Sequence, residues 1–189
     1  PQEENGLFSM DALPKLLALA EKADALLIGC GLGRSDTLTG IVCTLLEKAK
    51  CQIVLDADGI NSITGHKDIL RRTVKPVVLT PHAGEFARLS GKPDATAADA
   101  AQFAQDYRCI VLYKGHRTRI FTPDGAAYRN TSGNPGMAKG GSGDVLAGML
   151  VSLCGQGIDA VPAACTAAWL HGRAGDLAAN ALSEYGMTP

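Results

Sequence analysis

Short apolar runs alternate with helical patterns along most of the chain, and this alternation limits the possible folds more than any other feature. Strands are predicted at residues 25–28, 52–55, 77–79, 110–112 and 119–121. Apolar residues at helical spacing predict helices at 36–48, 96–107, 143 to about 154, and about 159 to 182. Short connections between these elements favour a mostly parallel sheet covered by helices, so we expect an α/β fold.

The composition is that of an ordinary globular domain. The 189 residues are 46% hydrophobic and 20% charged, with a formal net charge of −1. This near-neutral charge gives no electrostatic footprint for nucleic acid or an anionic membrane, so we expect neither as a partner. The six cysteines are scattered without a C-x-x-C pair, as buried free thiols are, which favours a cytoplasmic protein. Because the chain has no internal repeat or linker, residues 1–189 are predicted to form a single domain.

A glycine-rich segment at residues 134–144 carries the strongest functional signal. It reads Asn-Pro-Gly-Met-Ala-Lys-Gly-Gly-Ser-Gly-Asp, and an apolar, helix-forming run follows directly. Glycines leave backbone N–H groups uncovered, and those of residues 140–143 lie where the helix is expected to begin. Such amides, with the positive end of the helix dipole, form an anion site. Because Asp144 stands at its mouth, the segment predicts phosphate chemistry with a positioned acid or base.

Polar residues also gather directly after four of the predicted strands. These clusters lie at residues 29–33, 56–61, 80–85 and 114–118. In open α/β sheets, ligands bind at the carboxyl ends of the strands. Because the four clusters would share that rim, a single site there is better supported than any one cluster alone.

The first two clusters each allow two interpretations. The turn Gly-Cys-Gly-Leu-Gly at 29–33 either lets a ligand approach the backbone closely or is simply a tight turn. Asp56, Asp58 and Asn61 could contact substrate hydroxyls or a hydrated metal ion. Alternatively, Asp58 caps the short helix that follows it.

The other two clusters carry imidazole and charged side chains. Pro81 restricts the residue before it to an extended conformation, which fixes the direction of His82, and we expect His82 to face the site. Glu85 either contacts substrate or metal-bound water there, or complements the dipole of the next helix. Cations and free amides at 114–118 suit nucleotide phosphates, although a basic hairpin tip would look the same. His171, within the long C-terminal helix, is expected to be structural.

In chain order, these segments resemble one protein family. They read GxGLG, DADxxN, LTPHxGEFxRL, KGHRT, NPGMAKGGSGDVLAGM and AAWLHGRAGD, and the resemblance spans roughly residues 24–179. The chain resembles the ADP-dependent NAD(P)H-hydrate dehydratases, members of the ribokinase-like superfamily formerly described as carbohydrate kinases. This resemblance implies a central, mostly parallel sheet flanked by helices on both faces. The segments TPHAGEF and MAKGGSGDVLAG are its most specific parts.

The resemblance also implies roles for individual residues. Asp144 matches the superfamily's catalytic aspartate, and Gly33, His82 and Asp144 match positions that contact the substrate. ADP or ATP is the implied phosphoryl donor, accompanied by Mg²⁺, for which no direct protein ligand is implied. The implied nucleotide-binding residues are Lys114, Gly115, His116, Arg117, Thr118 and Gly143, to which the predicted anion site adds Gly141 and Ser142.

The activity implied by the resemblance is repair of NADHX and NADPHX, the hydrates of the reduced nicotinamide cofactors. A phosphoryl group passes from ADP or ATP to the hydrate hydroxyl, and elimination of phosphate regenerates NADH or NADPH. A homo-oligomer is expected, as is an NAD(P)H-hydrate epimerase in the same pathway or fused to the chain. Family members have an N-terminal portion before the segment that matches 25–33, so we expect residues 1–189 to be a partial ribokinase-like domain.

Two other functions are compatible with the same motifs. One is a true small-molecule kinase of the superfamily, acting on a sugar or on the alcohol of a vitamin precursor. The other is a nucleotide-binding remnant without catalysis. The fold and the phosphate site would be shared, so the fold alone does not decide among them. The TPHxGEF segment and the spacing at 137–139 favour the dehydratase.

Overall fold

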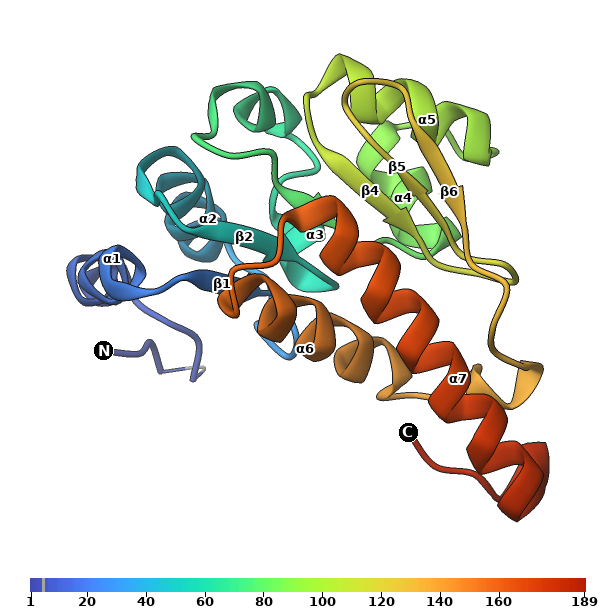
Figure 1. Ribbon diagram of the computed structural model, residues 1–189. Coiled ribbons are helices and arrows are strands. Elements are labelled where there is room, and N and C mark those ends of the chain that lie inside the picture. The colour runs from blue at the N-terminus through green and yellow to red at the C-terminus, as the bar shows by residue number, and fades with distance from the viewer. Residues whose placement is uncertain (5) are drawn as a thin grey trace.

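A single sheet of six strands organises the part of the chain that the computed structural model describes, residues 1–4 and 6–189 (Figure 1). Strands that are neighbours in the sheet are also neighbours in the sequence. The first four pair in parallel, and the last two are antiparallel additions at one edge. The strands are β1 (Ala25–Ile28), β2 (Gln52–Leu55), β3 (Val78–Leu79), β4 (Ile110–Tyr113), β5 (Arg119–Phe121) and β6 (Ala127–Arg129).

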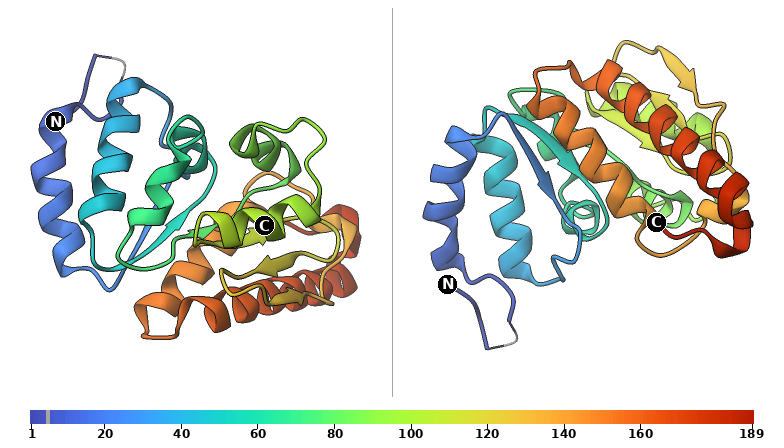
Figure 2. Two further views of the ribbon diagram at one scale, coloured as in Figure 1. Left: turned by 90° about the horizontal axis from the view of Figure 1, so that it is seen from above. Right: turned by 60° about the horizontal axis from the view of Figure 1, so that its bottom comes forward.

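Helices cover both faces of this sheet, which confirms the predicted α/β fold. The last two helices lie side by side on one face, and the earlier ones cover the other (Figure 1, Figure 2). The helices are α1 (Leu13–Lys22), α2 (Asp36–Lys48), α3 (Asp58–Ser62), α4 (Ala83–Ser90), α5 (Ala97–Asp106), α6 (Ser142–Gly155) and α7 (Ala160–Gly186), with 3₁₀ segments η1 (Met10–Ala12), η2 (Lys67–Arg72) and η3 (Pro135–Met137).

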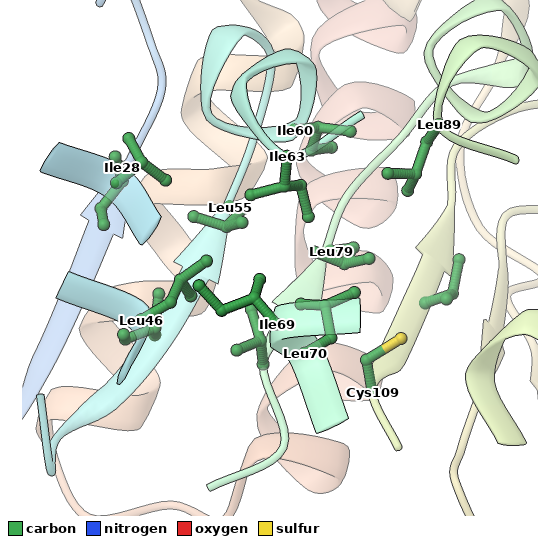
Figure 3. Close-up of a cluster of buried hydrophobic side chains, with 14 of the residues drawn as sticks. Ile28, Leu46, Leu55, Ile60, Ile63, Ile69, Leu70, Leu79, Leu89 and Cys109 are labelled. Carbon is green, nitrogen blue, oxygen red and sulfur yellow. The ribbon is translucent and has the colours of Figure 1, made fainter. Parts of the chain in front are cut away.

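Two apolar layers hold the helices to the sheet, because successive residues of a strand point to opposite faces. Ile53 and Leu55 of β2 belong to the larger layer, whereas Val54 belongs to the layer packed against α6 and α7. Figure 3 shows part of the larger layer, where side chains from α2, α3 and η2 meet the strands. Every residue of β2 is buried. This is the pattern of a parallel strand covered on both faces, and it leaves the strand ends as the place for polar groups.

The predicted elements are present with small changes at their ends. At the N-terminus of α5, the hydroxyl of the N-cap residue Thr96 accepts a hydrogen bond from the Asp99 N–H, and the Asp99 carboxylate accepts one from the Thr96 N–H. The long C-terminal helix extends past its predicted end, with a non-helical backbone at Ser183 (φ 65°). The sequence patterns did not predict α1 or β6. No helix in the described ranges is both long and apolar enough to cross a membrane.

Candidate active site

The carboxyl ends of β1 to β4 and the first turn of α6 meet at one rim of the sheet. Lys114, which follows β4, forms a parallel bridge with His82, which follows β3. Nearby, one side-chain ligand atom each from Cys30, Asp56 and Asp144 lies within 4.8 Å of the others. The rim therefore brings together residues from all four polar clusters and from the glycine-rich segment.

The start of α6 has the geometry of an anion site. Gly141 is its N-cap, with a left-handed backbone (φ 94°), and among the described residues no side chain caps the helix. The N-terminal amides and the helix dipole are therefore suited to bind an anion. Asp144 lies in the first turn and is exposed. An anion held by these amides would lie beside a carboxylate.

A partly buried ion pair lies directly behind this turn. The Lys114 Nζ is 2.7 Å from Asp56 Oδ1, and the same oxygen accepts a 2.7 Å hydrogen bond from the Thr80 hydroxyl. Asp56 is only 1% exposed. A Cβ added to Gly143 would lie 3.4 Å from the Lys114 Nζ. The ammonium group is therefore next to the candidate anion site, while Asp56 is already held by two protein groups.

His82 and Glu85 form a capping box at the start of α4. The His82 Nδ1 accepts hydrogen bonds from the N–H groups of Gly84 and Glu85, at 3.0 and 3.3 Å. In return, Glu85 Oε2 accepts the His82 N–H at 2.9 Å. Glu85 is buried and its Oε2 lies 3.8 Å from the Lys114 Nζ, whereas His82 is exposed. Glu85 thus serves the helix terminus and also contributes charge behind the rim.

Asp58 is not the N-cap of α3, so that interpretation is wrong. The chain turns at Ala57, which is the N-cap with φ 47°, and Asp58 enters the first turn instead. Its carboxylate reaches back to the β1 loop, where it accepts from the Gly33 N–H at 3.1 Å and from Arg34 Nε at 2.8 Å. Burial alone would raise the pKa of Asp58, but hydrogen bonds from Arg34, Asn61 and Gly33 outweigh it and hold the pKa below its usual range.

A cleft of about 700 Å³ opens on the β4 side of the anion site, a size typical of small-molecule pockets. Several predicted residues line it, and they are His82, Lys114, Gly115, His116, Arg117, Thr118, Ser142 and Gly143. The remaining predicted residues are not part of its lining, and they are Gly33, Asp56, Asp58, Asn61, Glu85, Gly141 and Asp144. Asp56 and Asp144 instead meet Cys30, and Asp58 binds Gly33 and Asn61. The candidate site thus has two parts, the cleft and an acidic part formed by Asp56, Asp144 and the Cys30 thiol. The two parts meet at the start of α6.

The sequence patterns missed one wall of the cleft. Asn130, Ser132 and Gly133 line it from a loop, and His171 lines it from α7. Burial lowers the pKa of His171, which favours the neutral imidazole. The loop is fixed to α7, because Asn130 Nδ2 donates to the Ala168 carbonyl at 3.0 Å. A run of Asn, Ser and Gly before the glycine-rich segment was the available signal, since such residues mark ordered turns.

The glycine-rich segment itself is also held by α7. The Asn134 Nδ2 donates to Asp176 Oδ1 at 3.2 Å. Lys139 Nζ donates to the carbonyl of Tyr185 at 3.2 Å and to that of Met187. Lys139 is therefore occupied by backbone carbonyls, so its charge supports the loop.

Cys30 lies between the two carboxylates of the acidic part. Its Sγ is 3.8 Å from Asp56 Oδ2. Partial burial, a hydrogen bond to Asp144 and the charge of Asp56 together raise the pKa of the Cys30 thiol to about 12. The thiol is therefore protonated throughout the neutral pH range and acts as a weak hydrogen-bond donor.

We expect Cys30 to react slowly with alkylating reagents. Because only the thiolate is a good nucleophile, its rate with iodoacetamide at pH 8 should be at least about tenfold below that of glutathione. Asp144→Asn should accelerate the reaction, since it removes one charge that disfavours the thiolate. The rate can be measured by mass spectrometry of the peptide that carries Cys30. A wild-type rate equal to that of glutathione would contradict this account of the cluster.

Comparison with known proteins assigns these features to one family. A family model described as NAD(P)H-hydrate dehydratase matches residues 4–189. The bifunctional NAD(P)H-hydrate repair enzyme Nnr of Moorella thermoacetica is 42% identical over 192 residues, covering 99% of this chain and 36% of that protein. The chain thus spans about a third of the length of this curated relative.

Solved structures give the same result. The ADP/ATP-dependent NAD(P)H-hydrate dehydratase from Bacillus subtilis, co-crystallized with ATP/Mg²⁺ and soaked with CoA, is 28% identical with a TM-score of 0.73, covering 95% of this chain and 73% of that one. A ribokinase-like superfamily protein from Enterococcus faecalis is 30% identical with a TM-score of 0.78, covering 95% and 62% of the two chains. The predicted ribokinase-like fold is therefore confirmed.

Proposed function

The chain belongs to the NAD(P)H-hydrate dehydratase family, and on that premise we propose that its protein dehydrates NADHX or NADPHX at the expense of ADP or ATP. A phosphoryl group would pass to the hydrate hydroxyl, and loss of the phosphate together with a proton from the neighbouring ring carbon would then restore the ring double bond. One observation carries this proposal. The anion site at the start of α6 joins a nucleotide-sized cleft to a carboxylate, Asp144, that is not part of the cleft lining.

We assign the cleft to the nucleotide. Lys114 to Thr118 line it beside Ser142 and Gly143, where backbone amides and side-chain cations suit phosphates. Amides already aimed at the transferred group stabilise the charge that develops on it, without reorganisation during the reaction. Gly141 contributes by starting the helix in a left-handed conformation. The phosphoryl group would therefore lie over the first turn of α6.

The hydrate is assigned to the acidic side of that turn. Asp144 would accept the hydrogen bond of the attacking hydroxyl and orient it toward the phosphoryl group. Gly33 would contact the rest of the substrate, with Asp58 fixing the Gly33 backbone at 3.1 Å, and His82 would contact it from the cleft lining. In this arrangement Asp144 stands between the two reactants.

The carboxylate oxygens on this acidic side are the kind of ligand that Mg²⁺ prefers. Mg²⁺ prefers oxygen ligands and usually keeps several waters and substrate phosphates. The exposed Asp144 carboxylate in the first turn of α6 could hold waters of the ion. When bound, the ion would neutralise charge on the phosphates. As further parts of the proposal, we expect a cytoplasmic homo-oligomer that works with an NAD(P)H-hydrate epimerase, separate or fused.

The function can be tested with purified protein and NADHX. Incubation with ADP or ATP and Mg²⁺ should restore absorbance at 340 nm, while omission of the nucleotide should abolish the recovery. NADPHX is assayed in parallel. Nucleotide consumption with a sugar or vitamin-precursor alcohol, and none with the hydrates, would instead identify a kinase. Nucleotide binding with no turnover of any acceptor would identify a remnant without catalysis.

A further inference from the structure

We propose that Asp56 is a positioning residue, which acts through the Lys114 ammonium to hold a positive charge beneath the phosphoryl-binding turn of α6. The inference rests on the proposed function, because that function places the transferred group over Gly143. Asp56 comes from the end of β2, Lys114 from the end of β4, and the two are 58 residues apart in sequence. The parallel sheet brings them to one rim.

The contacts of Asp56 leave it little freedom to bind a ligand through Oδ1. This oxygen is 2.7 Å from the Lys114 Nζ and accepts a 2.7 Å hydrogen bond from Thr80. Thr80 is itself 1% exposed, so its hydroxyl fixes the carboxylate from the interior of the protein. The other oxygen, Oδ2, lies 3.8 Å from the Cys30 Sγ and 3.9 Å from where a Cβ on Gly143 would be. A buried carboxylate in this arrangement is suited to fix the position of its cationic partner, and it is poorly placed to contact a substrate.

The position of the ammonium gives this restraint a function. The Lys114 side chain is 18% exposed and reaches the cleft, yet its Nζ lies 3.4 Å from where a Cβ on Gly143 would be. Glu85 lies farther from it, at 3.8 Å, and is itself held by the backbone of His82 at 2.9 Å. Asp56 is thus the close partner that sets where the charge sits. The backbone amides set the direction of the hydrogen bonds to a bound anion. A positive charge fixed at this point adds electrostatic attraction for that anion.

A double-mutant cycle with Asp56→Asn and Lys114→Met tests the proposal. Displacing a catalytic charge by about 1 Å can cost roughly 100-fold in rate, so Asp56→Asn should lower kcat by about that factor. The Kd for ADP should stay within about threefold of wild type, because the cation remains near the phosphates. Since Asp56 acts only through Lys114, the double variant should be no slower than Lys114→Met alone. Asp99→Asn removes the partner of Lys92, at 2.6 Å and outside the site, and should keep wild-type kcat.

A second measurement separates this inference from the hydrate reaction. Aluminium fluoride mimics a phosphoryl group in transfer, so with AMP it stands for transfer from ADP and with ADP for transfer from ATP. Binding of either pair needs no hydrate and should weaken in Asp56→Asn by more than ADP binding does. Rate losses that multiply in the double variant, or wild-type kcat in Asp56→Asn, would overturn the role of Asp56 and leave the hydrate assay unaffected. If Asp56→Asn does not fold, Thr80→Val replaces it in the cycle. An effect of Thr80→Val that persists without Lys114 would likewise overturn the proposal.

Discussion

Replacing Asp144 with asparagine is expected to remove most turnover and leave nucleotide binding intact. Asparagine keeps the size of the side chain but cannot accept the proton of the attacking hydroxyl. Loss of a general base or orienting carboxylate usually costs 10²- to 10⁴-fold, so kcat should fall by about 10³-fold. The nucleotide should still bind because its proposed contacts are the cleft residues, and Asp144 is not among them. Absorbance recovery at 340 nm measures the first effect, and titration calorimetry with ADP measures the second.

The matched control for this variant is Asp36→Asn. Asp36 is an exposed carboxylate in the first turn of α2, so it shares the helix position of Asp144 without belonging to the candidate site. We expect wild-type turnover from it. If Asp144→Asn also kept wild-type turnover, Asp144 would not be the orienting carboxylate. The acidic part of the site would then need another assignment.

Much of this site could be predicted because parallel sheets are simple to interpret. Each parallel strand is followed directly by its polar cluster, and parallel pairing of β1 to β4 carries those clusters to one rim. The start of α6 was equally accessible, since glycines before an apolar helix predict exposed amides. Such features depend only on the order of residues along the chain.

The partners within the rim could not be predicted in the same way. Asp56 pairs with Lys114 only because of the register between three strands, and no local pattern reports register. Asp58 turns toward Gly33 because Ala57 adopts a positive φ of 47°, which is uncommon for alanine. The strand β6 was missed because all of its residues are exposed, so its sequence lacks the alternation of apolar and polar residues that marks a half-buried strand. The wall formed by Asn130 and His171 depends on packing between distant segments.

The turn at 29–33 is where two interpretations remained open, and a stability measurement separates them. A Cβ on Gly29 would lie 1.7 Å from the Asp56 carbonyl oxygen and 2.6 Å from the Gly59 nitrogen, and its φ is 137°. Either backbone must move to admit a side chain. We therefore expect Gly29→Ala to lower the free energy of unfolding by at least about 3 kcal/mol, combining overpacking with backbone strain.

Gly31→Ala is the matched control within the same turn. Gly31 also has a positive φ, 67°, but no atom lies within 4 Å of the added Cβ. Only the left-handed backbone should cost free energy there, about 1–2 kcal/mol. Urea titrations of the two variants measure the difference. A Gly29→Ala variant as stable as Gly31→Ala but defective in substrate binding would show that the glycine admits a ligand. If Gly29→Ala is instead the less stable of the two variants, as expected, Gly29 is needed for close packing against the loop after β2, which carries Asp56 to the rim.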